Sequence, residues 1–112
     1  MIVGVLGLGY WGPNLVRNFL AQNEVSKVIG CDSRSDRLKF IAERFPAVEL
    51  ISECDELMNG NADIIVIATP VDTHYKFAKK ALESGKHIWV EKPFTSSSAE
   101  AEELIELADK KI

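Results

Sequence analysis

Apolar residues follow two alternating periodicities along the chain. Five short runs are apolar at nearly every position and rich in β-branched residues, which is typical of strands buried on both faces of a parallel sheet. These runs cover residues 2–6, 25–31, 48–51, 64–68 and 87–90. Between and after them, apolar residues recur every three or four positions, as on one face of a helix. The helical stripes centre on Leu15, Leu38, Leu57, Ala78 and Leu104.

Turn and capping residues agree with this division. Ser33, Ser52 and Ser97 each stand three residues before an acidic residue, a pattern that predicts helix starts. Pro13 falls in the first turn of its helix, and Gly85 suits a left-handed helix stop. Strands that alternate with helices predict right-handed βαβ units. The predicted fold class is therefore α/β: a doubly wound parallel (Rossmann) sheet of five strands in the order 3-2-1-4-5.

Composition narrows the class of protein. The 112 residues suit one domain, and 46% hydrophobic residues suit a packed core. A formal charge of −4 without a basic tract predicts that the chain binds neither nucleic acid nor an anionic membrane. The longest apolar run is far shorter than the about 20 residues of a spanning helix. The first residues show no basic n-region or cleavage site, so we expect no secretory signal; two cysteines without a CxxC motif predict a reducing cytoplasm and no metal site.

A glycine motif follows the first strand and opens the first helix. The six residues are Gly7, Leu8, Gly9, Tyr10, Trp11 and Gly12, a GxGxxG pattern. By itself this pattern also fits a glycine-rich turn. Its place between strand and helix predicts a dinucleotide site, because the helix N-terminus offers free N–H groups to a pyrophosphate. Tyr10 and Trp11 either cover the cofactor or pack near the domain edge.

An acid ends the second strand. Asp32 stands 20 positions after the third glycine, where a carboxylate accepts hydrogen bonds from the adenosine ribose and repels a 2′-phosphate. The alternative is a surface aspartate beside a helix start. We count Ser33 and Arg34 in the same cofactor site. NAD is the favoured cofactor; NADP stays open, because Arg34 and Arg37 either bind a 2′-phosphate or are solvated charges.

Two further polar groups follow the fourth and fifth strands. Thr69-Pro70 ends the fourth, with His74 in the helix behind it, and Glu91-Lys92-Pro93 ends the fifth. The carboxyl ends of parallel strands meet at one edge, so these residues should face the glycine motif. Pro70 is also compatible with an ordinary loop. His74 fits an interior helix histidine bonded to backbone better than a catalyst.

Together these motifs resemble the N-terminal half of the Gfo/Idh/MocA oxidoreductase family over essentially the whole chain. The resemblance implies reversible hydride transfer between nicotinamide and a carbinol carbon of a sugar, nucleotide sugar or cyclitol. It implies that Lys92 is the catalytic lysine near the nicotinamide ribose and the reacting hydroxyl. It also assigns Glu91 and His74 to the cofactor site. The run from Gly9 to Asn14 resembles members that act on sugars or nucleotide sugars.

The family's second domain has no counterpart in these residues. In relatives it supplies the substrate pocket, a catalytic His or Asp and much of a homo-oligomer interface, so we expect residues 1–112 to be the cofactor-binding half alone. The alternative is a stand-alone NAD-binding or redox-sensing module without turnover, which would not need Lys92. A coenzyme-A-binding module is disfavoured, because Asp32 suits ribose hydroxyls and not a 3′-phosphate.

Overall fold

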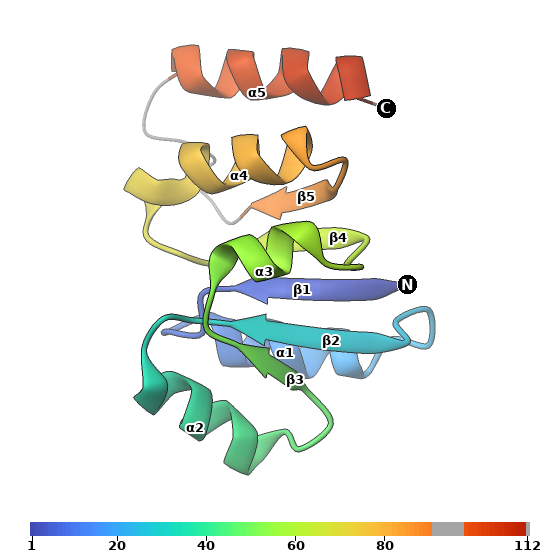
Figure 1. Ribbon diagram of the computed structural model, residues 1–112, viewed down its shortest axis with the longest axis vertical. Coiled ribbons are helices and arrows are strands. Elements are labelled where there is room, and N and C mark those ends of the chain that lie inside the picture. The colour runs from blue at the N-terminus through green and yellow to red at the C-terminus, as the bar shows by residue number, and fades with distance from the viewer. Residues whose placement is uncertain (91–97, 112) are drawn as a thin grey trace.

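The fold is a single five-stranded sheet covered by helices on both faces (Figure 1). A computed structural model describes residues 1–90 and 98–111. The strands are β1 (Ile2–Leu6), β2 (Lys27–Cys31), β3 (Glu49–Ile51), β4 (Ile64–Ile67) and β5 (His87–Val90). All neighbours are parallel, in the order β3-β2-β1-β4-β5. This confirms the predicted fold class and strand order.

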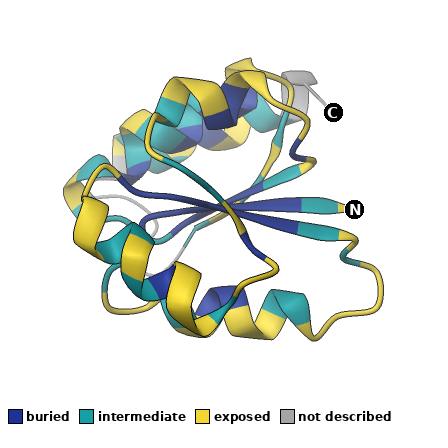
Figure 2. Cartoon of the chain, turned by 60° about the horizontal axis from the view of Figure 1, so that its bottom comes forward, coloured by how far each residue is buried: buried dark blue, intermediate teal, exposed yellow. Residues whose placement is uncertain are grey.

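Helices connect the strands and bury their apolar faces against the sheet. They are α1 (Gly12–Leu20), α2 (Ser35–Arg44), α3 (Cys54–Asn59), α4 (His74–Glu83) and α5 (Ser98–Lys111), with a 3₁₀ turn at Val71–Thr73. Figure 2 shows the buried strands lying between helices whose outward sides are exposed. None of the described helices has the length and apolar composition needed to cross a bilayer.

Two apolar clusters, one on each side of the sheet, hold the layers together. On one side Val3, Val5 and Val28 pack with Val16 of α1 and Ile41 of α2. On the other side, residues of β1, β2 and β4 pack with α3, α4 and α5; the helix residues are Leu57, Met58, Ala78, Ala81, Leu82 and Leu104. Side chains alternate between the faces of a strand, which is why β1 contributes to both clusters.

The predicted helix ends are partly corrected. Gly85 adopts φ +80° after α4, which confirms the left-handed stop. Ser33 and Ser52 are not N-caps: the N-cap residues are Arg34 and Glu53, and neither makes a side-chain capping bond. At α2 the carboxylate of Asp32 accepts the backbone N–H of Arg34, which is the N-cap residue itself. Ser97 lies outside the described residues.

Three predicted strands are shorter than their apolar runs. Strand β2 begins at Lys27, β3 at Glu49, and β4 ends at Ile67. At the starts of β2 and β3 the missing residues close turns: the Val25 N–H donates to the Gln22 carbonyl and the Val48 N–H to the Phe45 carbonyl. At the end of β4, Ala68 still donates its N–H to the Leu6 carbonyl of the neighbouring strand. Apolar character alone does not separate such turn residues from the strand that follows.

Candidate functional site

The glycine loop turns sharply between β1 and α1. Gly7 adopts φ +98°, and a Cβ there would lie 2.9 Å from the Ala68 carbonyl group. A Cβ on Gly12 would lie 2.4 Å from the Gly7 carbonyl oxygen, so only glycine lets the helix begin this close to the loop. The first turn of α1 carries no acidic side chain. The N-terminus of α1 therefore carries no negative side chain that would repel an anion.

Asp32 connects the end of β2 to this loop. Its side chain is 6% exposed. Its Oδ2 accepts the backbone N–H of Leu8 at 2.9 Å, and its Oδ1 accepts the backbone N–H of Arg34 at 2.9 Å. Burial raises the pKa of Asp32, but the hydrogen bonds from Arg34 and Leu8 outweigh burial and hold the pKa below its usual value. Asp32 is therefore a buried, ionised carboxylate and not a surface aspartate.

Two arginines from the start of α2 reach the loop and Asp32. Arg34 binds Asp32 with Nε at 3.1 Å from Oδ1 and Nη2 at 2.9 Å from Oδ2. Arg37 donates from Nε to the Leu8 carbonyl at 2.8 Å and from Nη2 to the Gly9 carbonyl at 3.2 Å. The guanidinium of Arg37 also lies 4.5 Å from the centre of the Phe40 ring. Both arginines are therefore held by hydrogen bonds to this part of the chain, although the side chain of Arg34 stays 57% exposed.

The turn after β4 is ordered by its own side chains. The Thr73 hydroxyl bonds the Pro70 carbonyl at 2.6 Å and the Thr69 hydroxyl at 2.7 Å. The ring of His74 is buried, and its Nε2 lies 2.7 Å from the Thr69 carbonyl oxygen. A carbonyl oxygen only accepts, so this nitrogen donates. The expected backbone-bonded interior histidine is thus confirmed, and His74 positions Thr69.

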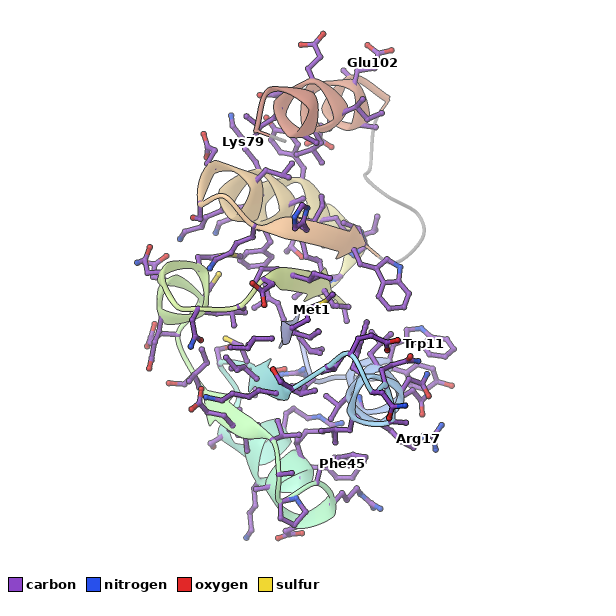
Figure 3. All side chains as sticks on the ribbon, turned by 90° about the vertical axis from the view of Figure 1, so that its right-hand side faces the viewer. Met1, Trp11, Arg17, Phe45, Lys79 and Glu102 are labelled. Atoms are coloured by element: carbon purple, nitrogen blue, oxygen red, sulfur yellow. The ribbon has the colours of Figure 1, made fainter. Side chains whose placement is uncertain are left out.

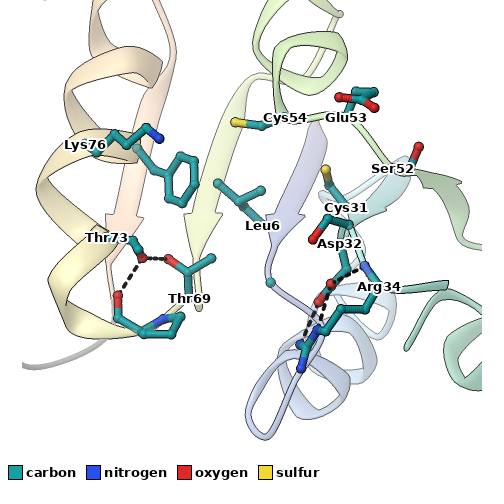
Figure 4. Close-up of a pocket in the computed structure, with 14 residues that line it drawn as sticks. Leu6, Cys31, Asp32, Arg34, Ser52, Glu53, Cys54, Thr69, Thr73 and Lys76 are labelled. Atoms are coloured by element: carbon teal, nitrogen blue, oxygen red, sulfur yellow. Dashed lines mark hydrogen bonds and ion pairs between the residues drawn. The ribbon is translucent and has the colours of Figure 1, made fainter. Parts of the chain in front are cut away.

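A hollow of about 540 Å³ opens at this edge of the sheet. Figure 4 shows it between the ends of β1 and β2 on one side and the turn before α4 on the other. Its walls bring together the predicted site residues Gly7, Asp32, Ser33, Arg34, Thr69 and Pro70. Sequence reasoning did not assign to this site Ser52, Glu53 and Cys54 after β3, or Lys76 and Phe77 on α4, which also line the hollow. The end of β3 is the signal that could have found the first three, because it meets the same edge.

Tyr10 and Trp11 project from the glycine loop. They are 86% and 56% exposed, and their rings meet edge to face at 5.0 Å. Figure 3 shows Trp11 on the side of the sheet that α1 covers, pointing outward. Both rings line a smaller hollow between the loop and Thr69. The two aromatic side chains therefore lie beside the glycine loop and not in the core.

The predicted Glu91, Lys92 and Pro93 lie outside the described residues. Strand β5 ends at Val90, which pairs with Ile67 of β4. Within residues 1–90 and 98–111, no group of three or more His, Cys, Asp or Glu could hold a metal ion.

Both cysteines border the hollow, and they differ in exposure. Cys31 is buried, as predicted for a core residue of the second strand. Its burial and the nearby Cys54 and Asp32 raise the pKa of its thiol to about 12. Burial also raises the pKa of Cys54, although Lys80 opposes the rise. Both thiols are therefore poor nucleophiles at neutral pH, and Cys31 is the poorer.

We expect iodoacetamide at pH 8 to modify Cys54 slowly and Cys31 more slowly still in the folded protein. At a pKa of about 12 only roughly one Cys31 thiol in 10,000 is ionised at that pH. Peptide mass spectrometry after timed labelling measures both rates, and urea-unfolded protein should label equally at both sites. Labelling of native Cys31 as fast as that of Cys54 would contradict the burial.

Comparison with known proteins identifies the family. A model of an oxidoreductase family with an NAD-binding Rossmann fold, GFO_IDH_MocA, matches residues 1–112. The chain belongs to the Gfo/Idh/MocA family. As a member it is an NAD-binding Rossmann domain, which agrees with the sheet order and the glycine loop.

Relatives of this Gfo/Idh/MocA chain extend well beyond it. The uncharacterized oxidoreductase YdgJ of Escherichia coli is 42% identical over 95% of this chain and 30% of its own length. The scyllo-inositol 2-dehydrogenase (NADP(+)) IolW of Bacillus subtilis is 33% identical over 97% of this chain and 30% of its own length. The crystal structure of GenD2, from gentamicin A biosynthesis and in complex with NAD, superposes with a TM-score of 0.91 at 27% sequence identity. The match covers 99% of this chain and 32% of GenD2. The chain thus spans about a third of each relative.

Proposed function

We propose that residues 1–112 are the cofactor-binding domain of a longer dehydrogenase. That enzyme would transfer hydride between a nicotinamide dinucleotide and the CH–OH group of a sugar, nucleotide sugar or cyclitol. The observation that carries the proposal is the juxtaposition of the glycine loop with the buried carboxylate of Asp32 in a member of this oxidoreductase family. The cyclitol specificity of IolW supports the substrate class.

The described residues fit a dinucleotide. A methyl group added to Gly9 would meet one side-chain atom among them, Nη2 of Arg34 at 3.2 Å, so described backbone does not obstruct a pyrophosphate there. The start of α1 faces the same space without an acidic side chain. Asp32 would accept hydrogen bonds from the adenosine ribose, and the hollow of about 540 Å³ beside it would take the adenine ring. We assign cofactor contacts to the loop, Asp32, Ser33, Arg34, Thr69, Pro70 and Glu91, and we assign His74 to the same site as a positioning residue.

The residues of this chain would bind and orient the dinucleotide and polarise the reacting hydroxyl group. The bound dinucleotide supplies the hydride acceptor or donor, which no side chain can supply. His74 would act on the cofactor site indirectly, because its hydrogen bond to the Thr69 carbonyl fixes the turn beside the glycine loop. Lys92 is the proposed catalytic residue, and a base from a second domain would complete the proton transfer. NAD is the preferred cofactor in this proposal because Asp32 is ionised.

Calorimetric titration of the 112-residue chain with NAD and NADP tests the cofactor part of the proposal. We expect the chain to bind at least NAD and to produce no sustained NADH from any polyol. Holding two reactants together lowers an activation barrier by roughly 7–11 kcal/mol, and the isolated chain would hold the dinucleotide alone. The full-length protein, tested with a panel of sugars and cyclitols, should reduce NAD with at least one of them.

Each part of the proposal has its own contradicting result. Absence of binding by either dinucleotide would refute the cofactor site. Turnover by the isolated chain would refute the need for a second domain. Full-length protein that binds NAD but oxidises no member of a broad polyol panel would favour the stand-alone binding module.

A further inference from the structure

Both cysteines of the chain lie on the same face of the sheet, beside the large hollow. Cys31 is the last residue of β2, and the parallel register places it next to Ile51, the last residue of β3. Cys54 begins α3, three residues after Ile51. All three residues belong to, or pack against, the apolar cluster that α3, α4 and α5 cover. The side chain of Cys31 therefore points to the face of the sheet on which Cys54 lies.

The two thiols line one hollow but differ in access from solvent. Both Cys31 and Cys54 belong to the wall of the large hollow. In the view of Figure 4, Cys31 lies between Cys54 and Asp32. Cys31 is 1% exposed, whereas Cys54 is only partly buried. An oxidant in solution therefore reaches Cys54 more readily than Cys31.

The start of α3 is the part of this wall that can shift. The helix has six residues, and its N-cap residue Glu53 makes no side-chain capping bond. Ser52 and Glu53 are exposed, while Leu57 and Met58 anchor the rest of the helix in the core. A disulfide joins Cα atoms about 4.4–6.8 Å apart, close to the spacing of about 4.8 Å between neighbouring strands. The segment that follows β3 thus starts within bridging range of β2.

We propose that Cys31 and Cys54 form a reversible disulfide that narrows the large hollow and lowers dinucleotide affinity. The inference rests on the proposed cofactor site. The bridge draws the first turn of α3 toward the end of β2, and with it Ser52 and Glu53 toward Asp32. These residues then enter the space that the adenine ring would take. A bound dinucleotide holds the two segments apart and protects the reduced pair.

The oxidant is a low-molecular-weight disulfide such as glutathione disulfide. The Cys54 thiolate attacks one of its sulfurs, the glutathione S–S bond breaks, and the first glutathione leaves and takes up the proton that Cys54 lost. The Cys31 thiolate then attacks Sγ of Cys54 and releases the second glutathione. Two electrons pass from the cysteine pair to glutathione disulfide, which becomes two thiols. The raised pKa of Cys31 leaves little thiolate, so the second step is slow.

Calorimetric titration with NAD before and after oxidation tests the inference. The 112-residue chain is incubated with glutathione disulfide at pH 8, and peptide mass spectrometry identifies the Cys31–Cys54 disulfide. We expect the Kd for NAD to rise about tenfold or more in the bridged protein and to return after dithiothreitol. By the same linkage, saturating NAD should raise the reduction potential of the pair by about 30 mV for each tenfold rise in Kd.

Two serine variants are the matched controls, and each is compared with itself before and after oxidation. Cys54→Ser keeps only the buried thiol, so oxidation should neither add glutathione nor change NAD affinity. Cys31→Ser should stop at the mixed disulfide of Cys54, because the second thiol is missing. Wild type that forms no bridge, or bridged protein with unchanged NAD affinity, would overturn the inference and leave the cofactor site intact. Reduced wild type that binds neither NAD nor NADP would instead refute the proposed function.

Discussion

Replacement of Asp32 by alanine should weaken NAD binding by about 10- to 150-fold, because a ribose hydrogen bond to a charged acceptor contributes roughly 1.5–3 kcal/mol. NADP should lose much less. The same change removes the negative charge that repels the 2′-phosphate and releases Arg34 from its ion pair. Calorimetric titration of wild type and variant with both cofactors measures the two losses. Equal losses for NAD and NADP would show that Asp32 does not read the ribose.

Asp32→Asn is the control for the structural part of this effect. Asp32 also accepts the backbone N–H of Leu8, which would be left buried without a partner in the alanine variant. Asparagine keeps an oxygen acceptor for that N–H but loses the charge. We expect the free energy of unfolding to fall by about 1–3 kcal/mol for alanine and by less for asparagine. Cofactor preference should shift in both variants, so binding and folding effects can be separated.

The sheet order could be predicted because its signals are local and repeated. The run at Ile64–Ile67 is apolar on both faces, which only a central strand under two helix layers tolerates. The GxGxxG motif placed the first strand next to the point where the strand order reverses, since the motif works only there. Handedness of the βαβ unit then left few arrangements. The five-stranded parallel sheet follows from these restrictions.

The side-chain contacts within the candidate site could not be predicted from sequence in the same way. Ser33 looked like a helix cap, but the neighbouring Asp32 already accepts the N–H of Arg34. Whether Arg34 faces solvent, a phosphate or Asp32 depends on its side-chain rotamer, which the sequence pattern does not encode. Lys76 and Phe77 enter the wall of the hollow because α4 packs over β4, a contact set by tertiary packing.

The end of β5 lies beside the end of β4, at the edge of the sheet that carries the glycine loop. Val90, the last residue of β5, pairs with Ile67, and Ala68 and Thr69 follow Ile67 toward the glycine loop. Hydride leaves an alcohol carbon as its hydroxyl proton departs, so negative charge develops on that oxygen. An ammonium beside the oxygen stabilises the charge and can relay the proton to a base. Lysine is usually solvated at a surface, so its role rests on its place in Glu91-Lys92-Pro93 directly after β5.

Lys92→Ala in the full-length enzyme should therefore lower turnover about 100-fold or more, while NAD affinity changes less than about tenfold. Steady-state rates on the preferred polyol and a separate NAD titration measure the two effects. Lys39→Ala, which removes an exposed lysine from α2, controls for the loss of positive charge and should keep the wild-type rate. Turnover near that of wild type would show that Lys92 takes no part in the chemistry, and a matching loss of NAD affinity would assign it to cofactor binding instead.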